Sequence, residues 1–222
     1  MNYPIDENML EGTQIPGLGD IYMQHFGYIT DGYFVEIGAF DGYHWSNTYP
    51  LAQIGWSGLL VEPHPEYYLQ CKARYADNPR IEVVRFAVGR ESCVTELYIG
   101  GSISTIKKEM IAIYNDLDWS KIAGLDEQKS IRVAMTTLDI LLDGHNVLPG
   151  FELLVIDVEG AEIDVLDGFS ILEWQPQMCI VEAHEKYPDK RLNAKARHIN
   201  RYFKTVGYRK IHADTINSIY VR

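Results

Sequence analysis

Four acidic side chains could carry the chemistry of this chain, because each stands at or near the end of an apolar run that resembles a buried strand. They are Glu36, Glu62, Asp157 and Glu182. In an open α/β sheet, ligands bind at the carboxyl ends of the strands. Four carboxylates at one edge repel one another, and a ligand with hydroxyls, an amine or a cation would offset that repulsion. Any one of them could instead be an acid that faces water, but together they predict a ligand site.

The segment that follows the first apolar run is the turn Glu36-Ile-Gly-Ala-Phe-Asp-Gly42. It has two glycines four residues apart, whereas a dinucleotide-binding turn has three. An acid before Gly38 suits a cationic or amino-bearing ligand better than a diphosphate. Glu62 ends the next run one crossover later, where it could accept both hydroxyls of a ribose. These features together indicate S-adenosylmethionine as the ligand.

The elements that must position these residues alternate between strand-like and helical patterns, which is typical of an α/β fold with a largely parallel sheet. We predict strands over 33–37, 58–62, 81–86, 95–99, 131–135, 153–157, 178–183, 208–212 and 218–221. We predict helices over 46–54, capped by Ser46 or Asn47, and over 66–75, 137–142, 162–166 and 192–206. The last two strands could form a hairpin at one edge. We expect one domain over 1–222, in which 1–30 cover the site and about 100–130 form an excursion over its edge.

The chain has 222 residues and a formal net charge of −11, from 20 Lys and Arg against 31 Asp and Glu. This acidic excess disfavours nucleic acid as a partner, because binding to phosphates relies on basic side chains. No apolar run is long enough for a membrane span, and the first ten residues lack a signal-peptide pattern. We therefore expect a cytoplasmic protein.

Six segments resemble, in order, the motifs of the FkbM-type S-adenosylmethionine-dependent methyltransferases. They are FVEIGAFDGYHWSNT (34–48), LLVEPHP (59–65), AVG (87–89), TTLDILL (136–142), LLVIDVEGAEIDVLDGF (153–169) and IVEAHE (180–185). The D-x-E-G-x-E run from Asp157 to Glu162 is the most specific of them. The resemblance implies a Rossmann-like class I methyltransferase fold, with a mixed, mostly parallel seven-stranded sheet and helices on both faces. It also implies O-methyl transfer, often to a sugar or polyketide hydroxyl, and fusion to or association with glycosyltransferases.

The resemblance also implies which residues bind the cofactor. They are Glu36 and Gly38 beside its methionine part, Asp41 and Asn47 near its polar groups, Glu62 on the ribose, Ala87 against the adenine, and Asp157. The segment from Gln14 to Asp20 matches the family only loosely, so that Gln14 or Asp20 could cap the cofactor.

Methyl transfer to a hydroxyl requires a base within about 3 Å of the acceptor oxygen. Asp157 and His184 are the candidate bases, and Glu182 shares a strand face with His184 because side chains alternate along a strand. Asp157, Glu159, Glu182 and His184 could instead hold Mg²⁺ or Mn²⁺, since oxygen-rich ligand sets with one imidazole suit these ions better than zinc. Glu159 and Glu162 could equally serve the positive end of the helix that begins there.

Aromatic and hydroxyl side chains outside the strands could contact the acceptor or only anchor loops. They are Tyr43, His44, Trp45, Tyr114, Trp119, Ser102 and Ser104. Our leading hypothesis is an O-methyltransferase that acts on a hydroxyl of a sugar, a glycan or a glycosylated metabolite. The alternative is a catalytically silent adenosyl-binding module that supports a partner enzyme. A nicotinamide-dependent oxidoreductase is disfavoured by the missing third glycine.

Overall fold

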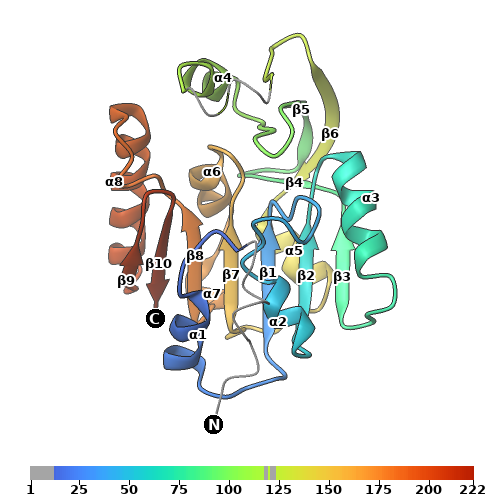
Figure 1. The fold of residues 1–222 in the computed structure, drawn as a ribbon, viewed down its shortest axis with the longest axis vertical. Helices are drawn as coiled ribbons and strands as arrows, with labels where there is room; N and C mark the ends of the chain where they lie inside the picture. Colours follow the sequence, from blue (N-terminus) through green and yellow to red (C-terminus); the bar gives the residue numbers. More distant parts are fainter. Residues whose placement is uncertain (1–12, 118–119, 121–123) are drawn as a thin grey trace.

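The computed structural model describes residues 13–117, 120 and 124–222 (Figure 1). Residues 1–12 of the expected N-terminal cover, and Trp119 of the expected excursion, lie outside the described residues. No helix in the described part of the chain is long and apolar enough to cross a membrane.

A seven-stranded sheet forms the centre of the fold, in the order β3-β2-β1-β7-β8-β10-β9. The first five strands in this order run parallel, whereas β10 is antiparallel to both β8 and β9. The predicted mixed sheet and the terminal hairpin are therefore confirmed. The strands are β1 (Tyr33–Ile37), β2 (Ser57–Val61), β3 (Ile81–Val84), β7 (Leu153–Ile156), β8 (Met178–Glu182), β9 (Arg209–Ala213) and β10 (Asn217–Val221).

Helices cover both faces of this sheet, because its central strands are apolar on both sides. Side chains alternate along a strand, so that Phe34 packs with α1, α2 and α3 while its neighbour Val35 packs with α5, α6 and α8. The helices are α1 (Leu18–Phe26), α2 (Tyr49–Gln53), α3 (Pro65–Arg74), α4 (Lys108–Asn115), α5 (Leu138–Gly144), α6 (Glu162–Asp167), α7 (Ile171–Trp174) and α8 (Lys190–Thr205).

A second sheet of three strands flanks the predicted excursion. It consists of β4 (Ala87–Val88), β6 (Ser130–Thr136) and β5 (Cys93–Tyr98) in that order, and Figure 1 shows β5 and β6 with α4 at the top of the view. The predicted strand over 81–86 is too long, because β3 ends at Val84 and the chain then pairs with β6. The excursion thus begins and ends in this small sheet, and its described residues contain helix α4.

The predicted start of the second helix is wrong. Helix α2 begins at Tyr49, and neither Ser46 nor Asn47 is its cap. The hydroxyl Oγ of Ser46 instead accepts hydrogen bonds from the backbone N–H groups of Thr48 (3.2 Å) and Tyr49 (3.1 Å) and donates one to Glu36 (2.9 Å). Hydrogen bonds to the buried carboxylate of Glu36 hold residues 46–48 in a turn. Helix α2 therefore begins at Tyr49 and not at residue 46.

Candidate functional site

Two adjoining cavities lie at the carboxyl ends of β1, β2, β7 and β8. The larger has a volume of about 860 Å³ and the smaller about 50 Å³. Both are lined by Gly38, Phe40, Gly101, Ser102, Asp157 and Glu159. The structure therefore brings the strand-end acids to one place, as the sequence predicts.

Gly38 lies where two loops approach each other closely. Its φ is +87°, and a Cβ atom at this position would lie 1.7 Å from the backbone oxygen of Asp157. The backbone N–H of Gly38 donates to Val61 (2.9 Å), and that of Asp157 donates to Ile37 (2.9 Å). Only a glycine fits this crossing, which brings the turn after β1 against the turn after β7.

Glu36 lines the larger cavity and organises the turn beside it. Its carboxylate accepts hydrogen bonds from the hydroxyls of Ser46 (2.9 Å) and Thr48 (2.7 Å) and from the backbone N–H of Asn47 (3.3 Å). Burial raises the pKa of Glu36 to about 7, although these three hydrogen bonds act to lower it. The side chain can therefore change its charge near neutral pH.

Glu62 lines the smaller cavity, together with Ala87. Its carboxylate accepts hydrogen bonds from the backbone N–H groups of Phe40 (2.9 Å) and His64 (2.8 Å), and burial raises its pKa to about 8. The rings of Phe40 and Tyr67, whose centroids are 4.2 Å apart, border the same cavity. A buried acid beside aromatic walls suits a ribose joined to a flat base.

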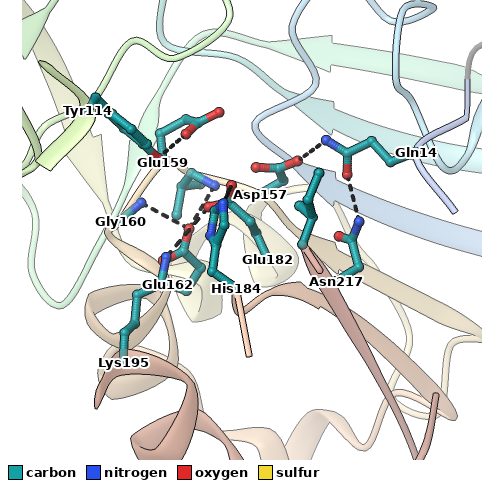
Figure 2. Close-up of polar contacts among 12 residues, drawn as sticks. Gln14, Tyr114, Asp157, Glu159, Gly160, Glu162, Glu182, His184, Lys195 and Asn217 are labelled. Carbon is teal, nitrogen blue, oxygen red and sulfur yellow. Dashed lines mark hydrogen bonds and ion pairs between the residues drawn. The ribbon is translucent and has the colours of Figure 1, made fainter. Parts of the chain in front are cut away.

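Asp157 follows β7 and faces the larger cavity. Its Oδ2 accepts a hydrogen bond from the amide of Gln14 (3.0 Å), whose Oε1 accepts one from Asn217 (3.0 Å), as Figure 2 shows. Its buried Oδ1 has no hydrogen-bond partner among the described residues. Burial and the charge of Glu162 raise the pKa of Asp157 to about 6. Gln14 therefore belongs to the site, whereas Asp20 lies exposed on α1.

A largely buried cation, Lys195, supports the site from α8. Its Nζ lies 2.9 Å from an oxygen of Glu162 and 3.5 Å from one of Glu182. The other oxygen of Glu162 accepts hydrogen bonds from the backbone N–H groups of Gly160 (3.0 Å) and Val158 (3.3 Å). Burial acts to raise the pKa of Glu162, but Lys195 outweighs it and lowers this pKa. Glu162 therefore serves the turn before α6, in accord with its predicted supporting role.

Glu159 joins the excursion to the site. Its φ is +54°, its carboxylate accepts a hydrogen bond from the phenol of Tyr114, and its backbone oxygen accepts one from Thr105 (2.7 Å). Burial and the charge of Asp157 raise its pKa well above the ordinary value. Tyr114 thus anchors the excursion through this acid, which was one of the two roles expected of it.

His184 follows β8 with a φ of +51° and lines the larger cavity. Its Nε2 lies 3.5 Å from Oε1 of Glu182, and its buried Nδ1 has no hydrogen-bond partner in the described part of the chain. Burial and the charge of Lys195 lower its pKa to about 4. Burial and the charge of Glu159 raise the pKa of Glu182 well above its ordinary value. The imidazole is therefore neutral at pH 7.

The structure brings together three of the four predicted metal ligands. Carboxylate oxygens of Asp157, Glu159 and Glu182 all lie within 4.8 Å of one another, and His184 does not belong to this group among the described residues. The donor set is thus made of carboxylates, which suits a hard divalent cation.

Asp41 and Asn47 line neither cavity. The carboxylate of Asp41 accepts hydrogen bonds from the backbone N–H groups of Tyr43 (3.0 Å) and His44 (2.9 Å) and contacts the imidazole of His44 (2.7 Å). The backbone of Asn47 contacts Glu36, and its oxygen accepts a hydrogen bond from Tyr22 (2.8 Å). Both residues shape the turn after β1, and their contact with the cofactor stays a prediction.

Sequence reasoning missed Lys195. A signal for it exists, because Lys195 stands within the apolar stripe of α8 formed by Leu192, Ala196 and Ile199. A lysine on the buried face of a helix needs an acidic partner, since an unpaired buried charge is costly.

The strand order and the antiparallel terminal hairpin define a class I methyltransferase fold, with the glycine turn and the acid after β2 at its ligand-binding edge. Residues 36–210 match the model of the Methyltransferase FkbM domain, and the chain belongs to this family. The family supports S-adenosylmethionine as the methyl donor.

Solved structures agree with this fold. The FkbM methyltransferase from Methylobacillus flagellatus KT superposes with a TM-score of 0.54 at 14% identity, over 87% of this chain and 44% of that protein. The chain thus spans less than half the length of that protein. A putative caffeoyl-CoA O-methyltransferase from Staphylococcus aureus superposes with a TM-score of 0.51 at 12% identity, over 97% of this chain and 88% of that protein. No curated protein matches the sequence.

Proposed function

We propose that the chain transfers a methyl group from S-adenosylmethionine to a hydroxyl of a sugar, a glycan or a glycosylated metabolite. The observation that carries this proposal is that Asp157 lines the larger cavity and that its buried Oδ1 has no hydrogen-bond partner among the described residues. A buried polar atom without a partner is costly unless a ligand completes it. A hydroxyl would supply the missing hydrogen bond and could then give up its proton.

The residues present fit the cofactor. Gly38 lines both cavities, and the carboxylate of Glu62 has acceptor capacity beyond its two backbone hydrogen bonds. Glu36 and Asp157 add negative charge where a sulfonium and an ammonium group would lie. When bound, S-adenosylmethionine supplies a methyl group on a positively charged sulfur.

Asp157 is the proposed general base. Its pKa of about 6 lies near the pH at which the enzyme would work, and this is the favourable range for proton transfer. Gln14 occupies Oδ2, so that Oδ1 stays available for the acceptor hydroxyl. His184 is a second candidate, because its neutral imidazole has an unused nitrogen on the same cavity. Glu182 contacts this imidazole and orients it.

A divalent cation offers another route to the same step. Mg²⁺ or Mn²⁺ held by Asp157, Glu159 and Glu182 would lower the pKa of the acceptor hydroxyl and orient it. Exhaustive chelation of the purified protein, followed by addition of each ion, decides between the routes. Activity that survives chelation unchanged would exclude the metal route and retain the general-base route.

Transfer of labelled methyl groups to a panel of saccharides tests the proposal. We expect incorporation by the natural chain, and we expect Asp157→Asn to bind S-adenosylhomocysteine but to lose turnover. Binding without transfer to any hydroxyl acceptor would favour the silent adenosyl-binding module instead. Association with a glycosyltransferase and a cytoplasmic location stay predictions.

A further inference from the structure

We propose that the exposed side of helix α8 binds the surface of a bilayer that contains anionic lipids. This inference does not depend on the proposed methyl transfer, because it concerns residues that line neither cavity of the site. Three observations support it. They are the separation of charge along the chain, a row of unpaired basic side chains on α8, and the lack of exposed large apolar side chains on the described helix.

The basic residues of this acidic chain are concentrated in one segment. Residues 190–213, which include α8 and β9, contain eight Lys and Arg and no Asp or Glu. The rest of the chain contains twelve Lys and Arg and all 31 Asp and Glu. Such a concentration of one sign attracts a partner of the opposite sign.

Helix α8 presents four of these basic side chains in one row, which we call the basic row. Its members are Lys190, Arg197, Arg201 and Lys204, all exposed. The buried residues of the helix are Leu192, Ala196, Ile199 and Phe203. Successive members of the row are seven, four and three residues apart, spacings that keep side chains on one side of a helix. At 1.5 Å per residue the row is about 21 Å long. Figure 1 shows α8 (orange) at the left margin of the fold, with no labelled element outside it in this view.

The charges of the basic row are available to an external partner. None of its side chains has an ion-pair partner in the described part of the chain. Three acids near the helix are held by other cations, because Asp116 and Asp189 pair with Arg191 (3.0 and 2.7 Å) and Glu185 pairs with Lys210. At physiological ionic strength a charge acts over about 8 Å. A surface in contact with the row therefore senses these charges more strongly than distant acids of the chain.

The surroundings of the basic row decide which anionic partner fits it. A stable protein interface has a core of large apolar side chains, and none of the described exposed ones lies on α8. A single nucleic-acid strand uses exposed aromatic rings for stacking, but Tyr202 is half-buried and Phe203 is buried.

A bilayer surface requires only accessible charges, and clusters of about four to eight Lys and Arg on an amphipathic helix are typical of binding to anionic lipids. Because α8 exposes no large apolar side chain that could enter the bilayer, we expect this binding to be electrostatic, reversible and sensitive to salt.

Co-sedimentation of the full chain with lipid vesicles tests the proposal. One set of vesicles contains phosphatidylcholine and phosphatidylglycerol in equal parts, and the other contains phosphatidylcholine alone. We expect binding to the first set only, with an about tenfold loss as salt rises from about 0.05 M to about 0.5 M. Arg197→Gln/Arg201→Gln should weaken binding about 25-fold, at about fivefold for each charge removed. Arg85→Gln/Arg132→Gln removes two exposed arginines outside α8. This matched control should weaken binding less than about twofold, because its charges lie outside the row.

A second pair of substitutions keeps the test independent of one variant. Lys190→Gln/Lys204→Gln, at the two ends of the basic row, should weaken vesicle binding to a similar extent as the central pair. The proposal is wrong if the natural chain fails to bind anionic vesicles at low salt or binds neutral vesicles equally well. It is also wrong if the control variant loses as much binding as the row variants.

Other partners of the basic row would give a different result. Binding to polyglutamate or to duplex DNA without binding to anionic vesicles would assign the row to a protein or a nucleic acid, and would overturn the proposal. The row variants should keep the affinity of the natural chain for S-adenosylhomocysteine, because the row lines neither cavity. Failure of methyl transfer would leave vesicle binding unchanged, so the two proposals fail separately.

Discussion

Replacing Lys195 by Met removes the cation that lies between Glu162 and Glu182. The side chain of Glu162 is fully buried, and those of Lys195 and Glu182 are 9% and 5% exposed. Removing one partner of a buried ion pair costs about 3–5 kcal/mol, because the remaining charge stays uncompensated. For a domain of this size, each kcal/mol corresponds to about 2–4 °C, so the melting temperature should fall by about 6–20 °C.

The loss of stability in Lys195→Met should depend on pH in a defined direction. In the natural chain the pKa of Glu162 is lowered, so its contribution to stability is present above its unfolded pKa and is lost as the pH falls through its folded pKa. Without Lys195, the folded pKa of Glu162 should rise above its unfolded value, and the pKa of Glu182, which is already raised in the natural chain, should rise further. These groups then destabilise the variant at high pH and cease to do so once protonated. The difference between the two proteins should therefore shrink between pH 8 and pH 5.

Urea unfolding followed by circular dichroism between pH 5 and pH 8.5 measures this difference. Lys204→Met is the matched control, since Lys204 lies exposed on the same helix and should change stability by no more than about 0.5 kcal/mol. A Lys195→Met variant as stable as this control at pH 8 would refute the reasoning. So would a loss of stability that grows as the pH falls.

Three further predictions concern the cofactor, the pH profile and the fold. Glu62→Gln should weaken binding of S-adenosylhomocysteine about 10- to 100-fold in calorimetry, because an amide NH2 group replaces one of two oxygens that accept backbone hydrogen bonds and disturbs the turn beside the ligand, while the exposed Glu66→Gln should not. The value of kcat/KM should rise between pH 5 and pH 7 as Asp157, with a pKa of about 6, loses its proton; a flat profile would argue against this base. Gly38→Ala should fail to fold stably, as measured by urea unfolding. Gly17 also has a positive φ but has open space around it, so Gly17→Ala should lower the free energy of unfolding by only about 1 kcal/mol.

The large sheet was predictable because its strands are continuous apolar runs, such as Leu153–Ile156, which is buried throughout. Two strands of the second sheet, β5 and β6, were also predicted, whereas β4 was not, because it has only two residues and its partner β6 lies more than forty residues further along the chain. The start of α2 was misplaced because contacts with another element, and not the local capping pattern, decide the conformation of residues 46–48. The residues expected to cap it, Ser46 and Asn47, are instead drawn to the buried carboxylate of Glu36.

The acids of the site were predictable because each stands at or next to the carboxyl end of a strand at the same edge of the sheet. Their partners were not, since these arrive from distant parts of the chain. Gln14 reaches Asp157 from the segment before the first helix, and Tyr114 reaches Glu159 from the excursion. Such contacts depend on tertiary packing, which no local pattern encodes.

The central claim is that the chain moves a methyl group from S-adenosylmethionine to a hydroxyl with the help of Asp157. The most direct test compares the natural chain with Asp157→Asn in a labelled-methyl transfer assay on the panel of saccharides, with S-adenosylhomocysteine binding measured for both proteins. We predict that both proteins bind the cofactor product and that only the natural chain transfers label at a substantial rate. Full transfer by Asp157→Asn, or no cofactor binding by the natural chain, would contradict the account.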